Sequence, residues 1–129
     1  WGSKRTGPDL ARVGKKYPDM WHFQHMMDPR SVTPNSIMPK YGWLVTKDTD
    51  FITLSKEYSV LKMMGVPYDE ETVANADIIA QKQAAEVAAS LVSQGAPAGL
   101  EKKQIVALIA YLQALGQKAQ VPTTAGGTN

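Results

Sequence analysis

The residue with the most specific chemical potential in this sequence is Met38, which lies between Ile37 and Pro39. A proline disfavours the α-helical region for the residue before it, so we expect Met38 to be extended and to lie on a stiff loop. Its thioether sulfur is a soft ligand that suits copper(I) or haem iron. Alternatively, Met38 fills a gap in an apolar core, as most methionines do. The Met-Pro pair alone favours this second interpretation, so the decision rests on the rest of the chain.

A second group of possible ligands lies in a short helix that we expect between residues 15 and 27. His22 and His25 are three residues apart, so their side chains can lie near each other on one side of a helix. Together with neighbouring methionines they could bind copper or zinc. A half-buried helix with one aromatic face explains the same residues, and we prefer that interpretation. The neighbouring methionines are Met20, Met26 and Met27.

Composition excludes several other functions. The sequence has no cysteine, which rules out disulfides, thiolate metal sites and cysteine nucleophiles within it. Its 14 basic and 12 acidic residues give a net charge of +2, and no run of lysine or arginine suggests binding to nucleic acid. We find no glycine-rich phosphate loop, no convincing Ser/His/Asp set and no apolar run long enough to span a membrane. We therefore expect a protein without a catalytic centre.

The elements that must position Met38 are helices, and we expect an all-α domain. Asp69 is a good N-cap and Ser55 a plausible one, Pro18 suits a first helical position, and Gly65 and Gly116 suit helix ends. The connection 30–44 carries Met38, and its length and its prolines are typical of an ordered, functional loop rather than a simple linker. The expected helices span residues 15–27, 54–64, 69–94 and 100–115.

Three short motifs, in order along the chain, resemble a class I cytochrome c. Gly7-Pro8-Asp9-Leu10 resembles the Gly-Pro-x-Leu that follows the haem-attachment motif in that class. Met38-Pro39 resembles the loop that supplies the distal methionine ligand. The segment from Ile109 to Gly116 resembles the C-terminal helix, with its Tyr-Leu-x-x-Leu-Gly ending.

A longer pattern closely resembles one family, the monohaem cytochrome c subunit (subunit II, FixO or CcoO) of cbb3-type cytochrome c oxidase. The resemblance implies electron transfer in a bacterial respiratory chain, at the periplasmic side of the inner membrane. It also implies that the catalytic and dihaem cytochrome subunits of the oxidase are the partners. The pattern consists of 1–14, Trp21-His22, Asp28-Pro29-Arg30, 36–39 with Tyr41 and Trp43-Leu44, and 65–71.

The resemblance also assigns roles to particular residues. Met38 corresponds to the sixth ligand of the haem iron. Pro8 corresponds to the residue that packs on the proximal imidazole and offers its carbonyl to the ring N–H. Four further residues are expected to form walls of the haem pocket, although an ordinary core position explains each of them equally well. These four are Leu10, Tyr41, Trp43 and Leu112.

The sequence departs from this family at the attachment motif, because Cys-x-x-Cys-His is absent. We therefore expect a haem-less fragment in which 1–116 is the distal part of the cytochrome domain, with a helical insertion at about 55–99, and 117–129 is a flexible tail. Apolar surface left uncovered should promote self-association. Two alternatives stay open, namely a periplasmic copper-handling module that uses Met and His, and a docking domain without a cofactor.

Overall fold

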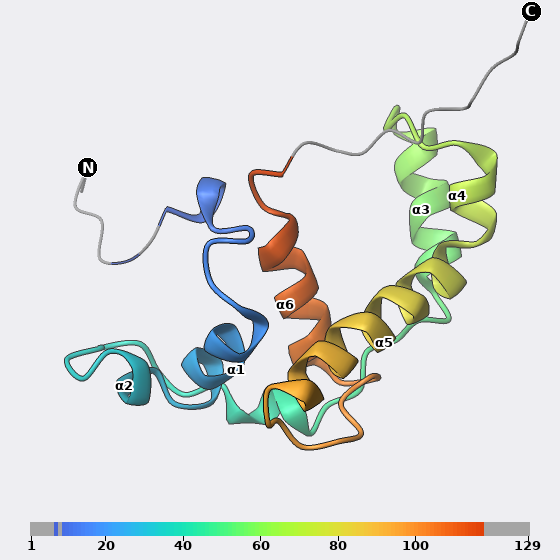
Figure 1. Ribbon diagram of the computed structural model, residues 1–129. Coiled ribbons are helices and arrows are strands. Elements are labelled where there is room, and N and C mark those ends of the chain that lie inside the picture. The colour runs from blue at the N-terminus through green and yellow to red at the C-terminus, as the bar shows by residue number, and fades with distance from the viewer. Residues whose placement is uncertain (1–6, 8, 118–129) are drawn as a thin grey trace, which may run out of the picture.

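The computed structural model describes residue 7 and residues 9–117, and over these residues the chain is helical without any strand (Figure 1). The all-α prediction is confirmed. Pro8 and residues 118–129, which include most of the predicted tail, lie outside the described residues. The elements are the 3-10 helices η1 (Leu10–Arg12) and η2 (Gly42–Val45) and the α-helices α1 (Asp19–Met27), α2 (Pro29–Val32), α3 (Leu54–Met63), α4 (Glu70–Ala74), α5 (Ala76–Ser93) and α6 (Gln104–Ala114).

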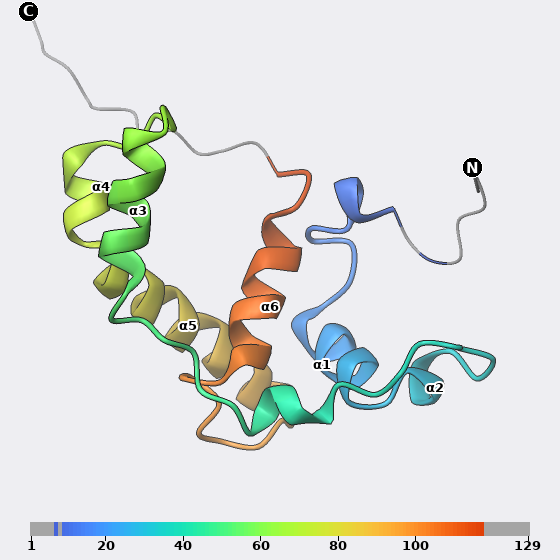
Figure 2. The same ribbon diagram turned by 180° about the vertical axis from the view of Figure 1, so that it is seen from behind.

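The core forms where α5, α6 and α1 meet. Ile105 and Ile109 of α6 are fully buried against Leu91 and Ala88 of α5, and Phe23 of α1 completes the cluster. In both views α3 and α4 lie side by side at one end of the molecule, and α2 lies at the opposite end (Figures 1 and 2). The loop after α2 carries Met38, so the candidate ligand is far from the α3–α4 end.

Small residues on α5 allow α6 to approach closely. Ala84 and Ala88 are buried one turn apart and Leu91 follows on the same face. Side chains of this size leave room for the branched residues of α6, which makes close packing possible.

The helix predicted over 69–94 is wrong in one respect, because it is two helices that meet at Asn75. Asp69 caps the first of them, and its side chain accepts a hydrogen bond from the backbone N–H of Thr72 at 2.6 Å. The chain leaves helical geometry at Asn75, whose side-chain amide donates to the carbonyl oxygen of Glu71 at 3.1 Å. Asparagine competes in this way with the backbone bonds of a helix, which explains the break.

The last helix begins later than predicted, at Gln104 rather than Leu100. The backbone before it pairs instead with the segment 47–49: Thr49 N–H donates to the carbonyl oxygen of Lys102 at 2.7 Å, and Gln104 N–H donates to that of Lys47 at 3.0 Å. Leu100 is still buried, but in a loop. At the other end, Gly116 has φ +75°, which agrees with the predicted helix end.

One further predicted helix start shifts, and one predicted N-cap is wrong although its helix starts at Leu54 as predicted. Helix α1 starts at Asp19, with Pro18 in the capping position just before it, rather than at Lys15. Helix α3 starts after Thr53, so the predicted cap Ser55 lies inside the helix. The end of α3 is as predicted, because Gly65 has φ +95° and Val66 N–H donates back to the carbonyl oxygen of Leu61 at 3.1 Å.

No helix in the described part of the chain combines the length and the apolar character needed to cross a membrane.

Candidate functional site

Hydrogen bonds hold the Met38 loop on both sides of the methionine. The backbone N–H of Met38 donates to the hydroxyl of Ser36 at 3.2 Å, and Ser36 N–H donates to the carbonyl oxygen of Thr33 at 2.9 Å. After the methionine, Tyr41 N–H donates to the carbonyl oxygen of Met26 at 2.8 Å, which ties the loop to the end of α1. The loop therefore holds Met38 in place without being a helix or a strand, as the proline predicts.

Charged side chains on the surface also stabilise the Met38 loop. Lys40 Nζ lies 2.8 Å from Asp28 Oδ2, and Arg30 Nε donates to the carbonyl oxygen of Ser36 at 3.4 Å. Asp28 also caps α2, because its Oδ1 accepts from the backbone N–H of Arg30 at 3.3 Å. The hydrogen bond from Lys40 is the main cause that lowers the pKa of Asp28, so this carboxylate stays charged at neutral pH.

Met38 is half-buried and lines a small surface cavity of about 210 Å³. Its neighbours there combine a buried proline with charged groups: Asp28, Pro29, Arg30, Pro39 and Lys40. The cavity is smaller than the sites that usually enclose a small organic ligand. The arrangement therefore offers one soft ligand at the edge of the molecule.

The structure places the four predicted pocket walls in different environments. Leu112 is buried in α6, and Tyr41 is half-buried against the core. Trp43 is 48% exposed with Lys47 Nζ 5.2 Å from its ring centroid, and Leu10 is 61% exposed in η1. Their role as haem-pocket walls stays a prediction, and so does that of Pro8, which lies outside the described residues.

The two histidines belong to the aromatic packing of α1. Trp21 is stacked between Tyr17 and His25, with ring centroids 4.1 and 4.7 Å away, and His22 meets the edge of Trp21 at 5.3 Å. His22 is only 2% exposed, and burial lowers the pKa of both imidazoles, so both are neutral at pH 7. Within the described ranges, no cluster of three or more His, Cys, Asp or Glu side chains could hold a metal ion.

Buried ring nitrogens remain unpaired on both histidines. His22 Nε2 and His25 Nδ1 have no hydrogen-bond partner among the described residues. A neutral imidazole tolerates this better than a charged one, because desolvation penalises the charged form most strongly. This environment opposes protonation of either ring.

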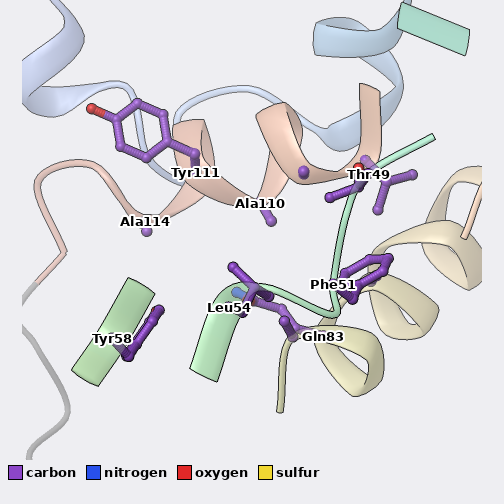
Figure 3. Close-up of a pocket in the computed structure, with 12 residues that line it drawn as sticks. Thr49, Phe51, Leu54, Tyr58, Gln83, Ala110, Tyr111 and Ala114 are labelled. Atoms are coloured by element: carbon purple, nitrogen blue, oxygen red, sulfur yellow. The ribbon is translucent and has the colours of Figure 1, made fainter. Parts of the chain in front are cut away.

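An apolar groove of about 420 Å³ opens elsewhere, between α3, α5 and α6 (Figure 3). Phe51 and Leu54 lie on one side of it and Tyr111 and Ala110 on the other (Figure 3). None of the residues predicted for the haem site lines this groove. The apolar groove and the Met38 loop are therefore separate features.

One important structural residue gave no signal in the sequence. The side chain of Gln113 in α6 accepts from the backbone N–H of Lys15 at 2.7 Å and donates to the carbonyl oxygen of Tyr17 at 2.9 Å and to Asp19 Oδ1 at 2.8 Å. It thus joins the segment before α1 to the C-terminal end of α6. Such bonds connect residues nearly a hundred positions apart, which periodicity cannot reveal.

An all-helical domain with a methionine on a proline-containing loop is consistent with a cytochrome c-like domain. Comparison with family models makes this specific. Residues 1–119 match the family described as "Cytochrome C oxidase, mono-heme subunit/FixO", and the chain belongs to that family. Comparison with curated proteins gives no match.

Among the predicted site residues, Met38 has the donor atom that suits haem iron. Met38 offers the thioether, and the hydrogen bonds around Ser36 and Tyr41 hold it in place. The sequence contains no cysteine, so this chain cannot form the covalent links of a c-type haem.

Proposed function

We propose that this chain is the electron-transfer domain of a cbb3-type cytochrome c oxidase. It would act on the periplasmic side of the bacterial inner membrane and pass electrons toward the oxygen-reducing subunit. The proposal includes contact with the catalytic and dihaem cytochrome subunits. Family membership over residues 1–119 supports it.

Met38 is the residue that carries the proposal, because its loop is fixed from both sides. When bound, haem iron supplies the chemistry by taking up and releasing one electron. A methionine ligand raises the potential of such an iron relative to a second histidine. The bonds made by Ser36, Arg30 and Tyr41 would hold the loop that carries Met38 while the iron changes oxidation state.

The remaining predicted site residues belong to the same proposal. Leu112, which is buried in α6, and Tyr41, which is half-buried against the core, would form walls of the haem pocket. Leu10 and Trp43 are exposed here, so each would be covered only by a group that this chain does not contain. Pro8 would contact the proximal ligand.

The absence of cysteine limits what this sequence supplies. We propose that it is the distal part of the haem domain, and that the covalent attachment and the proximal histidine come from residues outside these 129. The chain alone would then bind no haem covalently.

The test compares two single substitutions in the full-length, haem-loaded subunit assembled into its oxidase. Met38→Ala should lower the reduction potential of this haem and slow electron delivery to oxygen. Ile52→Ala is the control, because Ile52 is 87% exposed and lies outside the Met38 loop. Equal potentials in the two variants would contradict the proposal.

A further inference from the structure

Helices α3 and α4, with the turn between them, form a hairpin over residues 54–74 that has no buried side chain in either helix. Val60, Met63 and Met64 are separated by three and four positions, so they share one face, which we call the outer face of α3. Their exposed fractions are 51, 83 and 76%. Three adjacent large apolar side chains at this exposure form a patch of the kind found at interaction sites.

The hairpin is nevertheless well built. The rings of Tyr58 and Tyr68 lie 4.7 Å apart across it, and Lys62 forms an ion pair with Glu70. Gly65 allows the tight reversal after α3, and Asp69 caps α4. These local contacts hold the hairpin in one shape, so the outer face of α3 is presented as a fixed surface.

The position of the hairpin separates it from the ligand loop. In both views α3 and α4 lie at the opposite end of the molecule from α2 and the Met38 loop (Figures 1 and 2). A partner bound at the hairpin would leave Met38 and its surroundings accessible to another molecule.

Charge indicates which kind of partner fits. The hairpin, residues 54–74, contains four acidic side chains and two lysines, and Glu70 and Glu71 are exposed at the start of α4. An anionic lipid surface attracts basic rather than acidic segments, so this charge opposes a membrane. A protein surface with an apolar centre and a lysine- or arginine-rich rim is complementary to it.

We propose that the outer face of α3 is the surface by which this chain docks onto another subunit of the oxidase, at an apolar site with a basic rim. The partner class follows from family membership, because the family consists of oxidase subunits. The proposal rests on that membership and does not depend on Met38 or on electron transfer.

The test uses single cysteines, since the 129 residues contain none. Met63→Cys and, as control, Val92→Cys are introduced into the full-length subunit within the detergent-solubilised oxidase. Val92 is 43% exposed on α5, so in the free chain the more exposed position 63 should react faster with a maleimide. In the oxidase we expect the opposite order, with position 63 reacting at least about tenfold more slowly, because the reagent reaches it only in a minority of opened molecules.

A reagent that joins a thiol to an amine then identifies the occupant. Cysteine at position 63 should link to a lysine of a different oxidase subunit, and Val60→Cys should give the same partner. Position 63 reacting faster than position 92 in the oxidase would overturn the proposal. A cross-link between two copies of this subunit, or protection that appears only in lipid bilayers, would also overturn it in favour of self-association or a membrane.

Discussion

Removing the side chain of Gln113 should separate α6 from the segment before α1. Three hydrogen bonds are lost, to the backbone of Lys15, the backbone of Tyr17 and the carboxylate of Asp19. An ordinary intramolecular hydrogen bond contributes about 0.5–1.5 kcal/mol net, and one to a charged group contributes more. Gln113→Ala should therefore lower the free energy of unfolding by about 2–4 kcal/mol.

Urea unfolding followed by far-UV circular dichroism measures this loss. With a slope of about 2 kcal/mol per molar urea, the middle of the usual range, the midpoint should fall by about 1–2 M. Gln117→Ala is the matched control, because within the described residues the side chain of Gln117 makes one hydrogen bond, from its amide to the carbonyl oxygen of Gly14 at 2.9 Å. It should cost about 0.5–1.5 kcal/mol.

A charged variant distinguishes the acceptor role of the Gln113 amide from its donor role. Gln113→Glu keeps an acceptor for the backbone N–H of Lys15 but places a second carboxylate beside Asp19 and removes the donor to Tyr17. It should be at least as unstable as Gln113→Ala. If both Gln113 variants cost no more than the Gln117 control, then Gln113 does not hold this segment on α6.

Two further stability predictions follow from the burial of α6 and α1. Leu112→Ala should cost about 2–5 kcal/mol by leaving a cavity, and Leu108→Ala should cost less because Leu108 is only half-buried; equal costs in urea unfolding would contradict this. Burial lowers the folded-state pKa of His22 below its ordinary value of 6.5, so on acidification the unfolded chain binds a proton before the folded chain does. The free energy of unfolding should therefore be unaffected above pH 6.5 and should fall as the pH decreases through the folded-state pKa. His22→Leu should flatten the decline between pH 7 and 5, and an unchanged slope would show that His22 does not cause it.

The sequence predicts those parts of the fold that depend on neighbouring residues. Gly65 at the end of α3 and Asp69 at the start of α4 act within one helical turn, and both behave as predicted. Pro39 likewise predicts that Met38 is not helical, and Met38 lies outside the helices. Effects that depend on neighbouring residues can therefore be predicted from the sequence.

Features that depend on distant residues were missed. Leu100 continues the apolar period of the last helix, but pairing of residues 102–104 with 47–49 draws the backbone away. The ion pair between Asp28 and Lys40 and the bonds of Gln113 also join residues that no period connects. The break at Asn75 is different, because its signal is local: the side-chain amide of Asn75 bonds to the backbone of Glu71 within one turn.

The most direct test of the central claim is the absorption spectrum of the ferric, haem-loaded, full-length subunit with and without Met38→Ala. The weak band in the red that reports a methionine sulfur on ferric haem should be present in the unchanged protein and absent in the variant. Met63→Ala should keep the band. A Met38→Ala spectrum that retains the band would contradict the assignment of Met38 as the ligand.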